Sequence, residues 1–60
     1  MYFTRAEILD RLHEGRSWAT TRKGGRHIIG TTDDYALAKD DRGRVTLIPY
    51  SDIYSLEVAA

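Results

Sequence analysis

Two runs near the end of the chain alternate apolar and polar residues, which predicts short strands at about 44–49 and 53–58. One side of these strands carries Val45, Leu47, Tyr54, Leu56 and Val58, and the other carries Thr46, Ser55 and Glu57, with Ser55 and Glu57 facing water. Pro49 has no backbone N–H and therefore ends the first strand. The polar residues after it predict a sharp corner, at which Tyr50 is expected to be exposed.

A short amphipathic helix is predicted at about 4–14. Thr4 can cap its first turn, and Glu7 stands three residues later, as in a capping box. The apolar residues that share one face are Ile8, Leu9 and Leu12. Gly15 is a typical end for such a helix. Because a helix this short needs tertiary packing, we expect it to cover one end of a sheet.

The next segment predicts a β-hairpin with strands at about 16–23 and 26–32. β-branched and aromatic residues favour the first strand. The residues that share one side of that strand are Trp18, Thr20 and Arg22. Gly24 and Gly25 predict the tight turn between the strands, because glycine readily supplies the positive φ that a two-residue turn requires.

Residues 31–42 allow two interpretations. A strand at about 35–39, followed by a turn at 40–43, would form a second hairpin with the strand that follows. A helix is the alternative, because threonines and two aspartates stand where its N-terminus would be. Against the helix, Asp40 and Asp41 would place negative charge at its C-terminal end. We favour the strand.

These elements predict one small α+β domain spanning residues 1–60, mainly β. It consists of an N-terminal helix followed by a small, five-stranded, strongly bent antiparallel sheet or barrel. A chain of 60 residues buries little apolar surface, and this one has no cysteine for a disulfide. We therefore expect a homo-oligomer, with an exposed strand edge and opposed charge patches supplying the contact.

The absence of cysteine fits a reducing compartment, and no apolar run approaches the length of a membrane span. We therefore expect a cytoplasmic protein with no membrane partner. The two histidines have no neighbouring ligands at a zinc-binding spacing, so neither a metal site nor a cofactor is expected.

Charge is balanced overall but unevenly placed along the chain. Nine Lys and Arg residues offset nine Asp and Glu residues. Residues 15–30 carry a net charge of +4, and residues 31–41 carry −3. Opposed patches of this kind can steer a polyanion to one face, and they can equally pair two copies of the chain.

The candidate nucleic-acid-binding residues surround the first hairpin: Arg16, Trp18, Arg22, Lys23, Arg26 and His27. Arginines on strands can hold phosphates, and an adjacent tryptophan can stack on a base. A solvated hairpin surface is the alternative explanation of the same residues. His27 is also the candidate general base, because the unperturbed pKa of histidine lies near neutrality. No serine or cysteine nucleophile stands at a recognisable spacing, so we expect a non-catalytic protein.

The glycine spacing of residues 25–31 resembles the second strand of the Sm-like/Hfq family of small β-barrels. Residues 33–37 resemble the aspartate-containing entry to that family's third strand, and residues 44–58 resemble its last two strands. The resemblance implies an SH3-like barrel that assembles into rings and binds RNA. Ala36 stands where the RNA-binding asparagine of the family is expected.

A second resemblance is to the small HicA-type RNA-cleaving toxins. It rests on an opening helix followed by Trp18, Arg22, Gly25, His27 and the segment 45–49. In those toxins the histidine after the glycine is catalytic, which implies a ribonuclease role for His27.

Three functions therefore remain. The first is a small oligomeric module that binds RNA or another single-stranded nucleic acid without catalysis. The second is a protein-interaction or inhibitory module, such as a small phage- or plasmid-type factor that binds a larger protein. The third is a ribonuclease that uses His27.

Overall fold

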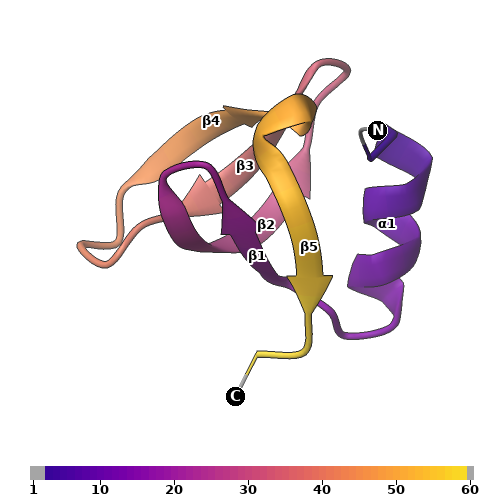
Figure 1. Ribbon diagram of the computed structural model, residues 1–60, viewed down its shortest axis with the longest axis horizontal. Coiled ribbons are helices and arrows are strands. Elements are labelled where there is room, and N and C mark those ends of the chain that lie inside the picture. Colours follow the sequence, from indigo (N-terminus) through magenta and orange to yellow (C-terminus); the bar gives the residue numbers. More distant parts are fainter. Residues whose placement is uncertain (1–2, 60) are drawn as a thin grey trace.

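The computed structural model describes residues 3–59, which form one helix packed against one sheet (Figure 1). The elements are α1 (Arg5–His13), β1 (Trp18–Thr21), β2 (Gly24–Thr31), β3 (Tyr35–Lys39), β4 (Val45–Pro49), the 3₁₀-helix η1 (Tyr50–Asp52) and β5 (Ile53–Glu57). The five strands lie in the order β4-β3-β2-β1-β5, with all neighbours antiparallel. The predicted helix-plus-five-stranded-sheet class is confirmed. The sheet is open, because β4 and β5 form its two edges and do not pair with each other, so the alternative of a closed SH3-like or Sm-like barrel is wrong.

The N-terminal helix has the predicted capping box. The backbone N–H of Glu7 donates to Thr4 Oγ1 at 3.2 Å, and the backbone N–H of Thr4 donates to Glu7 Oε1 at 3.0 Å. Gly15, with φ of +81°, follows the end of the helix. Ile8 is fully buried and Leu12 half-buried, whereas Leu9 is exposed, so the buried face is narrower than expected.

The first hairpin turns two residues earlier than predicted. Thr21 is paired with Gly24, so Arg22 and Lys23 form the turn, while Gly24 and Gly25 belong to β2. The Thr21 hydroxyl explains the difference. Its Oγ1 donates to the Gly24 carbonyl at 2.7 Å and accepts from the Lys23 N–H at 3.2 Å. These two bonds stabilise a turn at Arg22 and Lys23.

Residues 35–39 form strand β3, so the helical alternative for residues 31–42 is wrong. Asp40 stabilises the turn that follows, because its Oδ1 accepts from the backbone N–H groups of Arg42 and Arg44, each at 2.9 Å. Gly43 completes the turn with φ of +78°. The aspartate therefore acts as a turn residue, as its position in the sequence indicated.

The core lies between α1 and one face of the sheet, which we call the inner face; the opposite side is the outer face. The buried apolar residues are Ile8, Ala19, Ile28, Ala36, Ala38, Ile48, Ile53 and Leu56. Phe3, Leu12 and Tyr50 pack against them. Tyr50 is half-buried, so the prediction that it is exposed is wrong.

The core side of the last two strands also differs from the prediction. Ile48 pairs with buried Ala36 and points inward, which places the neighbouring Val45 and Leu47 on the outer face. In β5, the register shifts where the strand passes Thr20 and Thr21, so two residues three positions apart both reach the core. These residues are Ile53 and Leu56, while Tyr54 and Val58 are exposed.

Candidate nucleic-acid interface

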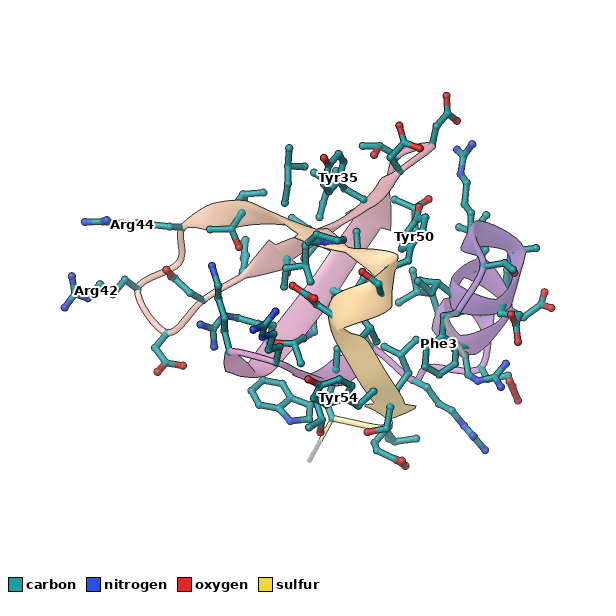
Figure 2. The ribbon with its side chains drawn as sticks, turned by 45° about the horizontal axis from the view of Figure 1, so that its top comes forward. Phe3, Tyr35, Arg42, Arg44, Tyr50 and Tyr54 are labelled. Atoms are coloured by element: carbon teal, nitrogen blue, oxygen red, sulfur yellow. The ribbon has the colours of Figure 1, made fainter. Side chains whose placement is uncertain are left out.

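The turns of the two hairpins lie at the same end of the sheet (Figures 1 and 2). Lys23 and Arg26 from the first hairpin line a cavity of about 200 Å³ together with Asp40 and Thr46 from the second. Asp52, in η1, also lines this cavity. We call this region the basic end, and its cations are Arg22, Lys23, Arg26, Lys39, Arg42 and Arg44.

Arg26 reaches this cavity from the inner face, because it is paired with buried Ala19. Its Nη1 donates to the backbone carbonyl of Gly25 at 2.7 Å, which fixes the half-buried side chain. Arg42 and Arg44 extend outward from the second turn (Figure 2). The basic end therefore combines one anchored guanidinium with several exposed cations.

Asp40 is the carboxylate most closely surrounded by these cations. The backbone N–H of Arg44 lowers the pKa of Asp40 most strongly, and the Arg42 N–H and the charges of Arg44 and Arg26 lower it further. The carboxylate is thus ionised at neutral pH but hydrogen-bonded within its own turn. It stabilises the geometry of the basic end while offsetting one of its charges.

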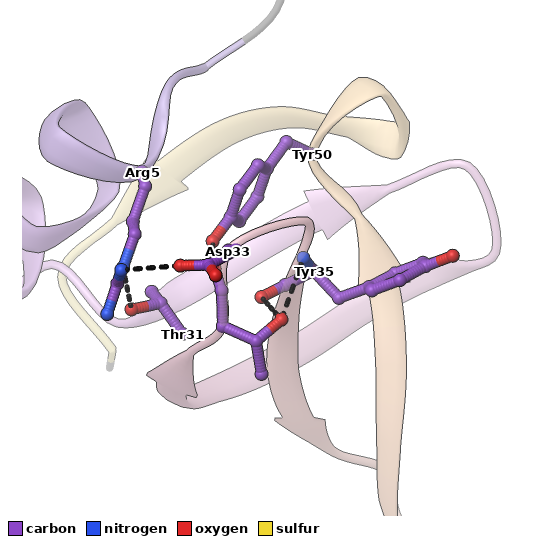
Figure 3. A network of polar contacts seen from close by, with 6 residues as sticks. Arg5, Thr31, Asp33, Tyr35 and Tyr50 are labelled. Carbon is purple, nitrogen blue, oxygen red and sulfur yellow. Dashed lines mark hydrogen bonds and ion pairs between the residues drawn. The ribbon is translucent and has the colours of Figure 1, made fainter.

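The opposite end of the molecule is acidic. Arg5 of α1 donates from Nε to Thr31 Oγ1 at 3.3 Å and forms an ion pair with Asp33 at 2.9 Å, so the helix and the β2–β3 turn lie together (Figure 3). The charged residues of this acidic end are Arg5, Glu7, Asp10, Arg11, Glu14, Asp33 and Asp34. Two arginines against five carboxylates give it a net charge of −3.

The basic end has the opposite balance. Its six cations face three aspartates, Asp40, Asp41 and Asp52, for a net charge of +3. The charges of Arg16 and Glu57, which belong to neither end, cancel each other. The fold therefore separates the charges of a neutral chain into a positive and a negative end.

Trp18 and His27 lie elsewhere, on the outer face. They are cross-strand partners on β1 and β2 and line an open hollow of about 480 Å³ with Val58 and Ala59. His27 is exposed, and Trp18 retains 40% of its accessible surface.

The six residues selected from the sequence are thus divided by the structure. Arg22, Lys23 and Arg26 meet at the basic end, Trp18 and His27 share the outer face, and Arg16 stands in the connection between α1 and β1.

Sequence reasoning missed Lys39, Arg42 and Arg44. The signal was available, because alternate turns of an antiparallel meander lie at the same end of the sheet. A predicted turn at 40–43 should have placed its cations beside those of the first hairpin.

Among residues 3–59, no group of three or more His, Asp or Glu side chains is arranged to hold a metal ion. No helix in this part of the chain has the length and apolar character needed to cross a membrane. Comparisons of the chain with protein families, curated proteins and solved structures found no match.

Proposed function

We propose that the protein is a small, non-catalytic module that binds single-stranded nucleic acid, with the phosphates held at the basic end. The observation that supports this proposal is the separation of charge between the two ends of the fold. The net charge of +3 at the basic end attracts a polyanion. The acidic end repels the polyanion, so the protein is oriented with its basic end toward it during approach.

The chemistry of the basic end suits phosphate oxygens. Five of its six cations are exposed, and the sixth, Arg26, borders the cavity. Four of the six are arginines, which form paired hydrogen bonds to phosphate. Thr46 adds an exposed hydroxyl group to the cavity lining.

Fluorescence anisotropy with a fluorescein-labelled nine-nucleotide RNA, and with the matching DNA, tests the proposal. The Arg42→Ser/Arg44→Ser variant should bind at least tenfold more weakly than the wild type at low salt, because two phosphate contacts are lost. Arg16→Ser is the matched control, since it removes a cation outside the basic end. No binding by the wild type at low salt, or equal losses in both variants, would contradict the proposal.

A second candidate function is protein interaction, including self-association, and the outer face favours it. Ile29, Tyr35, Val45 and Leu47 are all exposed there, each retaining 41–56% of its accessible surface. Val45 and Leu47 lie on the edge strand β4, whose unpaired side can add a strand from another chain. Isolation of one stoichiometric partner protein, abolished by Leu47→Asp, would favour this function over nucleic-acid binding.

A further inference from the structure

The indole ring of Trp18 is held flat against the sheet by the absence of a side chain at Gly25. A Cβ added at Gly25 would overlap Cζ2 of the ring and lie 2.9 Å from Cε2 and 3.2 Å from Nε1. The ring therefore occupies the space that any other residue would fill. One side of the indole rests on β2, and the side chain still keeps 40% of its surface exposed.

The ring also points toward the basic end. Trp18 itself is paired with His27, but its ring extends over Gly25, which follows Lys23 of the first turn by two residues. A nucleotide whose phosphate lies at the first turn can thus place its base over the indole.

Glu57 flanks the other side of Trp18. The two residues are paired across β1 and β5, on the outer face, so their Cβ atoms are roughly 5 Å apart. An ionised carboxylate only accepts hydrogen bonds. It therefore favours a base that presents N–H donors at its edge, and guanine, with adjacent N1–H and N2–H₂ groups, presents the most suitable pair.

We infer that Trp18, Gly25 and Glu57 form a stacking site for one unpaired base, with guanine preferred over uracil. This inference rests on the proposed function and narrows it, because the faces of bases in a duplex are covered by their neighbours. The ligand class is single-stranded nucleic acid with an accessible guanine. The hollow beside the ring, lined by His27 and Val58, lies within the range of roughly 300–1,000 Å³ that holds small organic groups.

Trp18 is the only tryptophan, so its fluorescence reports on this site directly. Titration with a nine-nucleotide RNA of eight uridines and a central guanosine should quench the emission. A duplex of the same length should bind at the basic end and leave the emission nearly unchanged.

Affinity measured with a labelled oligonucleotide tests the same residues independently of tryptophan emission. Trp18→Leu should weaken binding of the guanosine-containing strand by about tenfold, and Trp18→Tyr should restore most of it. Gly25→Ala should weaken binding because it displaces the ring. Gly30→Ala is its matched control, because Gly30 lies on the same strand and the same face as Gly25. The Cβ added at Gly30 would meet Leu37 Cδ1 at an ordinary distance of 3.4 Å.

Base preference tests Glu57. Glu57→Gln should reduce the preference for the guanosine-containing strand over nine uridines, whereas Glu14→Gln, which removes the same charge at the acidic end, should not. Salt-sensitive binding with unchanged Trp18 emission and no effect of Trp18→Leu would overturn the stacking site while leaving the proposed function intact. Absence of any oligonucleotide binding at low salt would overturn both.

Discussion

The hydroxyl of Tyr50, in η1, donates a hydrogen bond to the backbone carbonyl of Thr32, in the connection between β2 and β3. The two residues are 18 positions apart in the sequence. The bond joins the corner before β5 to the turn that Arg5 also contacts through Asp33. The β2–β3 turn is thus held on one side by η1 and on the other by α1.

Tyr50→Phe should lower the free energy of unfolding by about 1 kcal/mol, because the ring stays packed while one partly buried hydrogen bond is lost. Urea denaturation followed by circular dichroism measures the change. Tyr54→Phe is the control and should change stability by less than about 0.5 kcal/mol, since Tyr54 is exposed. Equal effects of the two variants would contradict the structural role of Tyr50.

Thr4→Ala should destabilise the protein by about 1 kcal/mol, because the first turn of α1 loses its side-chain cap. Thr4→Ser keeps the hydroxyl acceptor and should remain close to the wild type. The same urea titration compares them, and no difference between the serine and alanine variants would mean that the cap is unimportant.

Stability should also fall at acid pH. Hydrogen bonds from Thr4 lower the pKa of Glu7 below its ordinary value of 4.5, and the Arg44 N–H lowers that of Asp40 below 3.8. A lowered pKa in the folded state stabilises the protein above the unfolded-state value, and this contribution is lost as the pH falls through the folded-state value.

One substitution tests whether Asp40 contributes to the loss of stability at acid pH. Asp40→Asn keeps an oxygen acceptor for the turn but cannot titrate, so its unfolding midpoint should change less than that of the wild type below about pH 4. Asp41→Asn, in the same turn, is the control. If both variants follow the wild-type pH profile, Asp40 does not contribute through its charge.

Self-association through the outer face is testable by mass. Sedimentation at high micromolar concentration should give a mass above the 6.8 kDa of one chain, and Leu47→Asp should return it to that value, because a charge would then lie in the apolar contact. Ser51→Asp, at an exposed position in η1, should leave the association unchanged. A monomeric wild type at this concentration would contradict the prediction.

Features determined by local chemistry were predictable from the sequence. The capping box of Thr4 and Glu7 and the turn begun by Asp40 each depend on groups within a few residues, and both occur as expected. The turn at Arg22 and Lys23 was not predicted, because the Thr21 hydroxyl competes with the glycine signal beside it.

Features determined by strand pairing were not predictable from alternation alone. β4 carries apolar residues on both sides, so only its pairing with β3 decides that Ile48 faces the core and Leu47 does not. The position of the candidate site is different in kind. Lys23 and Arg42 are far apart in the sequence, but the two predicted hairpins already imply that their turns lie at one end of the sheet.

The salt dependence of binding tests the central claim most directly. Anisotropy titrations between 50 and 200 mM salt should show the affinity for single-stranded RNA falling steeply, since each neutralised phosphate adds about 0.7 to the slope of log K against log salt. Removing two cations in Arg42→Ser/Arg44→Ser should reduce that slope by about 1.4, while Arg16→Ser leaves it unchanged. A slope near zero in the wild type, or the same slope in all three proteins, would contradict phosphate binding at the basic end.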